Sequence, residues 1–462
     1  MNENMNRSRI TQLWNRYNSQ TVLIILLLIY LSYLIFIATN LNYGISPDET
    51  AHLIFSKHFS TTWSIPPDSL ETLKQGWYIT HNPFLYHWIN GRTINVIQLF
   101  APNSTEWQIT VVLRLFGVLW SLGTVIFSYL LSKEVLSGKW SQILPVFLLT
   151  NTLMFVFISG AVTYDNLANF LSMASIYFLV RVLKFKNFVM NSLLWIIFIC
   201  LGTLVKYPVL PLALVLFCVW IIFFLMNRKK IEFSYKNSFQ LYSFLFLALS
   251  LVVVNLYLYG GNLIKFGSIT PDCQQLFSDD ICDLSPFVQR HYEYGLEEKL
   301  TIMESIKTGF PHPVEYFFYD WVELMLSRIY GILAHINYFP SHIIIFYKLL
   351  FLWLLLLGFR YWKGPSFTII SLILIFGFYT LTLFLKNYNT ELVYGFKNIA
   401  LQGRYIFPVI GIFYVLIGYI VEITQNIFLK YSTTVLMAIL FLVGGPLKFI
   451  YRYNLIFSDW FK

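Results

Sequence analysis

An acidic pair, Asp48 and Glu49, occurs in the run SPDETAH near the start of the chain. Ser46 is a favourable N-cap, Pro47 suits the first helical position, and Glu49 falls where a capping-box acid reaches back. The run therefore predicts a helix start in which Glu49 has a structural role. Asp48 has no such role, and with His52 four residues later on the same helix face it is a candidate for chemistry. The alternative is an ordinary solvated helix start.

Further charged residues stand at the ends of apolar runs. Asp165 lies in a turn, where it either caps the next helix or belongs to a site. Lys206 precedes Tyr-Pro and Arg404 opens the run GRYIFP, and an isolated charge beside an apolar segment is costly. Each cation either snorkels to the membrane surface or binds an anion such as phosphate. His81, in HNPFLY, begins an aromatic segment that either anchors at the membrane interface or contributes to a site.

The elements that carry these residues are membrane helices. The chain is 57% hydrophobic and 12% charged, with a mean hydropathy of +0.63, whereas a soluble domain has about 25% charged residues. Its apolar segments predict an all-α polytopic membrane protein, a single domain over 1–462 with about eleven transmembrane helices. The expected spans are near 21–39, 108–131, 141–159, 167–183, 189–205, 208–226, 239–259, 342–359, 366–385, 405–424 and 433–450.

The distribution of charge predicts the orientation. With the N-terminus in the cytoplasm, the short loops rich in Lys and Arg all fall on the cytoplasmic side. The net charge of +9 therefore sets topology, and we expect no nucleic-acid partner. Two long loops, 40–107 and 260–341, then lie outside, as do the acidic motif and the isolated cations. We expect a multi-pass protein of the plasma or inner membrane with its site on the external face.

The second long loop contains two local features. Cys273 and Cys282 lie close together in a polar stretch without further Cys or His at zinc-binding spacing, so an external, oxidising location favours a disulfide. Two free thiols are the alternative. From about 312 to 335, apolar residues at helical spacing alternate with acids and Arg328, which predicts an amphipathic helix on the membrane surface.

Taken in order, the motifs resemble those of the GT-C superfamily of membrane glycosyltransferases, which includes protein mannosyltransferases and the aminoarabinose transferases that modify lipid A. The matching pieces are the acidic pair with its histidine, HNPFLY, the turn acid, LVKYP and QGRYIFP. HNPFLY looks like the H/K-P-P-L pattern of the superfamily, although Asn82 stands where many relatives have Pro. The chain looks closest to a bacterial branch with a similar Cys-containing external segment.

The resemblance implies transfer of a sugar from a polyprenyl phosphate to a glycan, lipid or protein acceptor on the outer face, with inversion. The phosphate leaves without protonation, so one carboxylate base suffices, while fixed cations stabilise the departing anion. The resemblance makes Asp48 and Asp165 catalytic. It assigns substrate binding to Glu49, His52, His81, Lys206, Arg404 and Tyr405.

Other interpretations remain open at this stage. Asp48, His52 and Asp165 are side chains able to bind a divalent metal ion, but relatives differ in metal use and the cofactor is left undecided. A transporter or flippase of lipid-linked sugars is the main alternative function, although such proteins place polar sites near the bilayer midplane. A non-catalytic scaffold of the cell envelope is disfavoured, because it would not need the two acids and two cations together.

Overall fold

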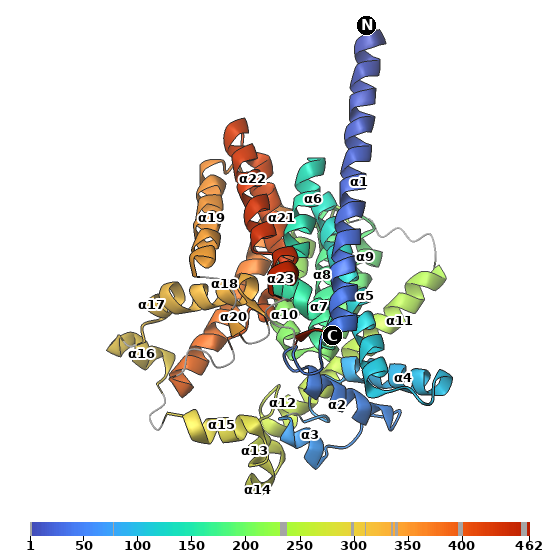
Figure 1. Cartoon of the computed structure of the whole chain (residues 1–462), viewed down its shortest axis with the longest axis vertical. Helices are drawn as coiled ribbons and strands as arrows, with labels where there is room; N and C mark the ends of the chain where they lie inside the picture. Colours follow the sequence, from blue (N-terminus) through green and yellow to red (C-terminus); the bar gives the residue numbers. More distant parts are fainter. Residues whose placement is uncertain are drawn as a thin grey trace.

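The computed structural model is almost entirely helical (Figure 1) and describes residues 2–76, 78–231, 238–296, 300–309, 311–333, 336–337, 341–395, 401–453 and 460–462. Ten segments of this described part are long and apolar enough to cross a membrane, which confirms the predicted all-α polytopic class. The helices that form them are α1 (Asn2–Asn40), α5 (Glu106–Val135), α8 (Tyr164–Leu183), α9 (Phe188–Val205), η1 (Tyr207–Val209) with α10 (Leu210–Asn227), α11 (Ser238–Asn255) with η2 (Leu256–Gly260) and α12 (Gly261–Phe266), α19 (Ser341–Arg360), α20 (Phe367–Tyr394), η4 (Gly403–Ile406) with α21 (Phe407–Ile423), and α22 (Ile427–Val443) with α23 (Pro446–Tyr453).

A bent pair of helices makes an eleventh crossing if it is counted as one span. Helices α6 (Lys139–Thr150) and α7 (Leu153–Ser159) are apolar enough to span only as a pair, and they meet at a bend of 67°. The side chains of Asn151 and Thr152 donate to the carbonyls of Phe147 and Leu148, each at 2.8 Å. These side-chain bonds add to the backbone pairing at the end of α6, where the amide of Asn151 bonds to the carbonyl of Leu148 at 3.3 Å.

The position of the C-terminal residues supports an odd number of crossings. Leu41, just after α1, pairs in a β-bridge with Phe461, and the amide of Asn42 donates to the carbonyl of Trp460 at 2.7 Å. The final residues therefore lie at one end of α1, whereas the N-terminus lies at the other end (Figure 1). Counting α6 and α7 as one span gives eleven crossings, which agrees with this arrangement.

Labelling of single cysteines tests the proposed orientation. In a chain whose Cys200 and Cys218 are replaced by Ala, a cysteine at Ser64 should react with an impermeant maleimide in intact cells. Ser64 is exposed between α2 and α3, whereas the nearby Ser69 caps α3 and is better left in place. The control is a cysteine at Ser137, exposed before α6, which should react only after permeabilisation. The reverse pattern would invert the topology.

Short helices cover the face at which α1 ends. The first long loop contains α2 (Glu49–Ser60), α3 (Leu70–Lys74) and α4 (Leu85–Phe100). The second contains α13 (Cys273–Leu276), α14 (Asp279–Cys282), α15 (Pro286–Tyr294) and α16 (Ile302–Thr308), then α17 (Pro313–Glu315), η3 (Tyr316–Trp321) and α18 (Val322–Tyr330). The strands of the described part are β1 (Ile332–Leu333) and β2 (Ile336–Asn337), which form one antiparallel pair.

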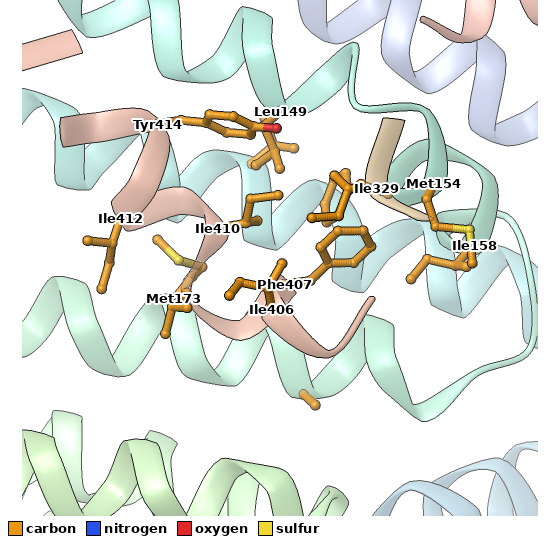
Figure 2. Packing of buried hydrophobic residues seen from close by; sticks show 14 of the residues in the cluster. Leu149, Met154, Ile158, Met173, Ile329, Ile406, Phe407, Ile410, Ile412 and Tyr414 are labelled. Carbon is orange, nitrogen blue, oxygen red and sulfur yellow. The ribbon is translucent and has the colours of Figure 1, made fainter. Parts of the chain in front are cut away.

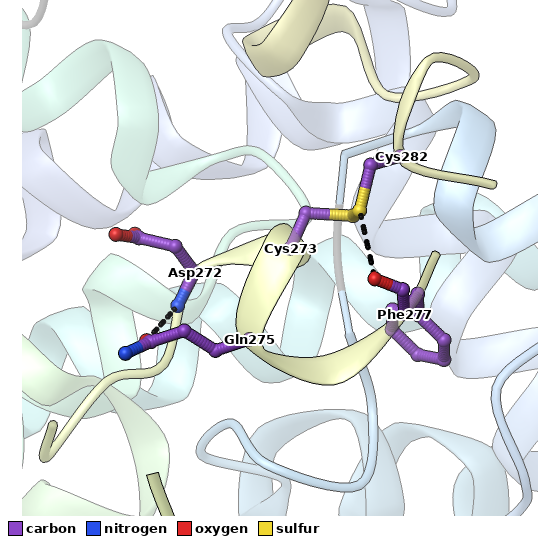
Figure 3. Close-up of a disulfide and its surroundings, with 5 residues drawn as sticks. All are labelled: Asp272, Cys273, Gln275, Phe277 and Cys282. Atoms are coloured by element: carbon purple, nitrogen blue, oxygen red, sulfur yellow. Dashed lines mark hydrogen bonds between the residues drawn. A yellow bond between two sulfur atoms is a disulfide. The ribbon is translucent and has the colours of Figure 1, made fainter. Parts of the chain in front are cut away.

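The second loop contains a disulfide and an amphipathic helical stretch. Cys273 and Cys282 form a disulfide that joins α13 to α14, and Figure 3 shows it beside the carbonyl of Phe277. A continuous helical stretch runs over 313–330 and buries Trp321, Met325 and Ile329 at intervals of four residues, so it is amphipathic. The predicted continuation to 335 includes residues 334–335, which lie outside the described residues.

Helix α8 is at the centre of the bundle. Of its apolar window 83% is buried, against 11% for the segment that contains α11. Helix α8 packs against α5, α9 and α21, and Figure 2 shows Met173 of α8 beside Ile406 and Phe407 at the start of α21. Such close packing holds the first residues of α8 and the segment before α21 in fixed positions.

Candidate active site

Four charged residues singled out from the sequence meet at the ends of separate helices. Asp48 directly precedes α2, Asp165 is in the first turn of α8, Lys206 joins α9 to η1, and Arg404 lies in η4 before α21. They are distant in sequence, and only the packing of the bundle brings them together. We call these four residues the ion network.

The ion network alternates acids and cations. Arg404 Nη2 pairs with Asp48 Oδ2, and Arg404 Nη1 lies 3.5 Å from Asp165 Oδ2. Lys206 Nζ pairs with Asp165 Oδ1. The side chains of Arg404, Lys206 and Asp165 are 1%, 4% and 2% exposed, whereas that of Asp48 is 45% exposed. Asp48 is therefore the accessible carboxylate of the network, and Asp165 is the one that orients both cations.

Aromatic rings enclose the ion network. Lys206 Nζ lies 4.6 Å from the ring centre of Tyr164 and 4.5 Å from that of Tyr405, distances at which cation–π attraction operates. The imidazole of His52 packs edge-on against Tyr164 with ring centres 4.4 Å apart. Burial lowers the pKa of His52 to about 4, although the carboxylates of Asp48 and Asp165 act in the opposite direction. His52 is therefore a neutral group beside the network at physiological pH.

The backbone at Asp48 differs from the prediction. Helix α2 begins at Glu49, and Asp48 is its N-cap with φ 60° and ψ 6°, in the left-handed region. No side chain caps the helix, so the expected cap by Ser46 with a capping box from Glu49 is wrong. Asp and Asn tolerate the left-handed region better than other residues with a Cβ. This backbone conformation, which spacing alone does not reveal, turns Asp48 toward Arg404.

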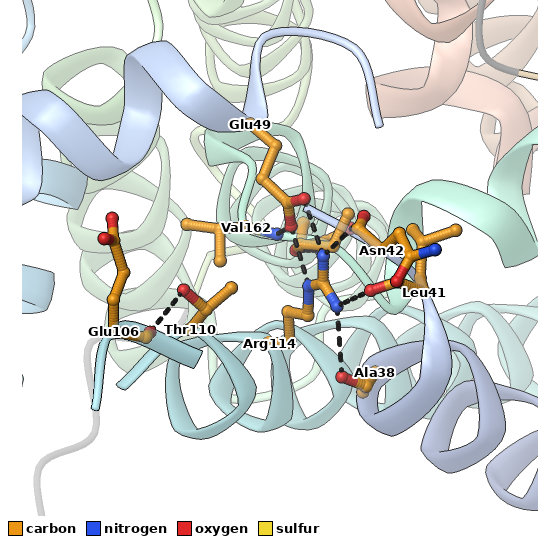
Figure 4. Close-up of polar contacts among 10 residues, drawn as sticks. Ala38, Leu41, Asn42, Glu49, Glu106, Thr110, Arg114 and Val162 are labelled. Atoms are coloured by element: carbon orange, nitrogen blue, oxygen red, sulfur yellow. Dashed lines mark hydrogen bonds and ion pairs between the residues drawn. The ribbon is translucent and has the colours of Figure 1, made fainter. Parts of the chain in front are cut away.

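Glu49 has a structural role of a different kind (Figure 4). Its carboxylate accepts from Arg114 Nε at 2.8 Å and Nη2 at 2.7 Å, and from the amide of Val162 at 3.0 Å. Both side chains of this ion pair are fully buried. Arg114 also donates to the carbonyls of Leu41 and Asn42 after α1. The pair thus joins α2 to α5, the end of α1 and the turn before α8, and its geometry does not support substrate binding by Glu49.

His81 contacts a different part of the protein. Its Nδ1 lies 2.9 Å from Oδ1 of Asn262 on α12, and Asn262 Nδ2 donates to the carbonyls of His81 and Ile269 at 3.0 and 3.1 Å. The structure gives His81 no bond to the ion network. Asn82, the departure from the H/K-P-P-L pattern, donates to the carbonyl of Tyr78 at 2.7 Å and so closes the turn itself. This motif therefore fixes the two long loops relative to each other.

A cavity of about 610 Å³ lies beside the ion network. Tyr164, Lys206 and Tyr405 form part of its wall, and most of the remaining wall is apolar and comes from α10 and α20. Leu214 and Phe378 line it and are exposed on these spanning helices. A polar network at one side of a largely apolar cavity is typical of a site for an amphipathic ligand.

Comparison with known proteins shows a similar fold. Residues 81–258 match the family described as dolichyl-phosphate-mannose-protein mannosyltransferase. The chain also superposes on the Archaeoglobus fulgidus oligosaccharyltransferase tethered with an acceptor peptide, with a TM-score of 0.50 and 14% identity over 93% of this chain and 56% of that one. The fold is that of GT-C membrane glycosyltransferases. The resemblance found in the sequence motifs is thereby confirmed.

A second solved structure is also similar to this chain. ArnT from Cupriavidus metallidurans bound to undecaprenyl phosphate matches with 13% identity and a TM-score of 0.47, over 89% of this chain and 62% of that one. No curated protein sequence matches the chain. This chain covers less than two thirds of the length of each of these two solved structures.

The ion network does not provide the metal site considered from the sequence. Within the described ranges, no group of three His, Cys, Asp or Glu side chains is arranged to hold a metal ion. Asp48 and Asp165 already pair with Arg404 and Lys206, and protonated cations compete with a metal for the same oxygens. The residues present do not fit a resident metal, and no step below depends on one.

Gly403 is a further residue on which this site depends. A Cβ at this position would lie 2.6 Å from both the carbonyl carbon and oxygen of Arg328, which are backbone atoms that cannot turn away. Gly403→Ala should therefore displace η4 and with it Arg404, at a cost of about 1–3 kcal/mol for overpacking. We expect a loss of turnover together with a lower melting temperature.

Gly377→Ala on α20 is the matched control for this substitution. A Cβ there meets nothing within 4 Å, and Ala favours a helix relative to Gly by about 0.5–1 kcal/mol. We expect equal or higher thermal stability and wild-type turnover from the control. Wild-type turnover in Gly403→Ala would show that the close approach to Arg328 does not position Arg404.

Proposed function

We propose that the protein transfers a sugar from a polyprenyl-phosphate donor to a cell-envelope acceptor on the outer face of the membrane. The observation that carries the proposal is the position of the ion network at the wall of the apolar cavity. A polyprenyl tail requires an apolar groove between spanning helices, and its phosphate requires cations at headgroup depth. The cavity with Lys206, Tyr405 and the adjacent Arg404 supplies both.

The reaction is assigned to the network as follows. Asp48 accepts the proton of the acceptor hydroxyl, whose oxygen forms a bond to the anomeric carbon of the sugar. The bond from that carbon to the phosphate oxygen breaks, and the phosphate leaves with the electron pair. A single displacement of this kind inverts the anomeric configuration. One accessible carboxylate, rather than the two of glycoside hydrolysis, agrees with this scheme.

The cations act on the departing phosphate. Negative charge develops on it as the bond breaks, so Lys206 and Arg404 stabilise the transition state more than the bound donor. Asp165 contacts both cations and has the role of holding them in place. His52 and Tyr164 pack beside the network, and we assign the imidazole a positioning role within the substrate site. Glu49 and His81 are left out of this assignment because of their contacts with Arg114 and Asn262.

Release of the lipid product tests the proposal. Purified protein in lipid nanodiscs should convert polyprenyl-phosphate sugars into free polyprenyl phosphate only when a suitable acceptor is present. A panel of donors differing in the sugar identifies the substrate. The transporter or flippase alternative predicts movement of intact donor across proteoliposomes without release of phosphate. No feature within the described ranges specifically favours that alternative.

The proposal also specifies the membrane in which the protein lies and the side on which its site opens. Two external loops, 40–107 and 260–341, would cover a site in the plasma or inner membrane, with the N-terminus in the cytoplasm. The disulfide in the second loop supports an oxidising compartment on that side. The acceptor, whether glycan, lipid or protein, would approach Asp48 from the exposed side of the ion network.

A further inference from the structure

Lys206 and Lys386 are the cations among the described residues that line the cavity, and Lys386 differs from both Lys206 and the adjacent Arg404. Lys206 and Arg404 are each paired with carboxylates of the ion network. Lys386, on α20, instead donates from Nζ to the hydroxyl of Tyr207 at 2.8 Å and lies 4.5 Å from the centre of its ring. The structure gives Lys386 no ion pair with any described carboxylate. It is therefore a cation of this cavity whose charge is not neutralised by a neighbouring acid.

The depth of Lys386 along α20 corresponds to that of a lipid headgroup. Helix α20 starts at Phe367, so Lys386 lies about 20 residues and about 30 Å along it, which is the thickness of the hydrocarbon layer. Tyr207, its partner, directly follows Lys206 in the chain. Lys386 and Lys206 thus approach the same end of the cavity from different helices.

We propose that Lys386, with Tyr207, binds the phosphate of the lipid donor when the donor first enters the cavity. This inference rests on the proposed function and assigns a residue that the motifs do not mark. For Lys206 or Arg404 to bind a ground-state phosphate, either would have to weaken its pairing with Asp165 or Asp48. To bind an anion, Lys386 gives up only its hydrogen bond to the neutral hydroxyl of Tyr207. The hydrogen bond that it gains, from an ammonium to a phosphate, is stronger than the one that it loses.

The division of roles has a kinetic consequence. Lys386 contributes to the affinity for the donor. Lys206 and Arg404 instead stabilise the transition state, in which negative charge develops on the leaving phosphate. Replacing Lys386 should raise KM for the donor more than it lowers kcat. Replacing Lys206 or Arg404 should mainly lower kcat. A lysine that only extends toward bulk lipid headgroups would produce neither difference.

Binding of two matched probes tests the inference. Undecaprenyl phosphate and undecaprenol share a tail and differ only in the phosphate, so their affinities for the full chain in nanodiscs isolate the phosphate contribution. Lys386→Gln should weaken undecaprenyl phosphate binding by about 10- to 100-fold and leave undecaprenol unaffected. Lys386→Arg should retain most of the phosphate preference. The control is Lys348→Gln, a lysine on α19 that pairs with Glu323 away from the cavity and should change neither affinity.

The outcomes separate this inference from the proposed function. If the wild-type chain prefers the phosphate probe and Lys386→Gln retains that preference, the assignment of Lys386 is wrong while the donor class stands. If the wild-type chain binds both probes equally, no phosphate site exists, and the proposed donor fails together with Lys386. Selective loss of the phosphate preference in Lys386→Gln, with normal melting temperature, supports both.

Discussion

Asp48→Asn should lower turnover by about 10²–10⁴-fold while the protein remains folded, because the substitution removes the basic lone pairs of a general base and little else. Asn occupies the left-handed backbone region at least as readily as Asp, so the φ of 60° before α2 is preserved. The amide oxygen can still accept from Arg404. Release of polyprenyl phosphate per unit time measures the effect, and a thermal melt in the same detergent shows whether folding is intact.

The control for Asp48→Asn is Glu106→Gln at the start of α5. Glu106 is another acid at the same face of the bundle, 56% exposed and paired with Lys57, and it lies outside the ion network. Its substitution should leave turnover at the wild-type level, because an exposed ion pair contributes little. Equal turnover of wild type and Asp48→Asn would remove Asp48 as the base and direct attention to Asp165.

The transmembrane architecture could be predicted from the sequence because its signals are long and repeated. Each apolar run of about 20 residues is an independent indication of a span, and α8 and α9 coincide closely with predicted segments, whereas α20 extends beyond the predicted end at 385. The break between α6 and α7 could not be predicted, since hydropathy alone does not distinguish a straight helix from one bent at Asn151 and Thr152. Side-chain bonds to the backbone make that difference.

The candidate site was only partly predictable. Asp48 stands out as the acid of its motif without a structural role, and Asp165, Lys206 and Arg404 stand out as charges at the ends of apolar runs. The structure brings the four together. Which acid pairs with which cation depends on tertiary packing, so the sequence gives no indication that Asp165 holds both cations. Whether these residues perform the proposed chemistry stays a prediction.

Two residues show why sequence motifs misassign roles. Glu49 lies beside Asp48 in the same motif, yet Asp48 adopts the left-handed region before α2 whereas Glu49 is the first helical residue, and the carboxylate of Glu49 meets Arg114 instead of the ion network. Lys386 belongs to no motif, although it is a lysine directly after the predicted span 366–385, on the side expected to be external. A lysine on the external side is an exception to the positive-inside pattern. The same kind of exception identified Lys206, so the sequence already contained this indication for Lys386.

Arg114→Met should destabilise the protein by about 3–5 kcal/mol, because it leaves the carboxylate of Glu49 buried without a countercharge. The carbonyls of Leu41 and Asn42 also lose their donor. The double variant with Glu49→Gln should be less destabilised than Arg114→Met alone, since Gln is neutral and still accepts from the amide of Val162. Melting temperatures of the three proteins in one detergent measure these differences.

Lys57→Met is the matched control, since it removes the cation of an exposed pair with Glu106 at the same face. It should cost about 0–1 kcal/mol. If Arg114→Met lowered the melting temperature no more than Lys57→Met does, the buried pair would not support the fold.

The buried pair between Arg114 and Glu49 also affects the position of Asp48. Because Glu49 is the first residue of α2 and Asp48 directly precedes it, loosening this pair should displace Asp48 from Arg404. Arg114→Met should therefore lose turnover at temperatures below its melting transition, which links the stability of this pair to the geometry of the ion network.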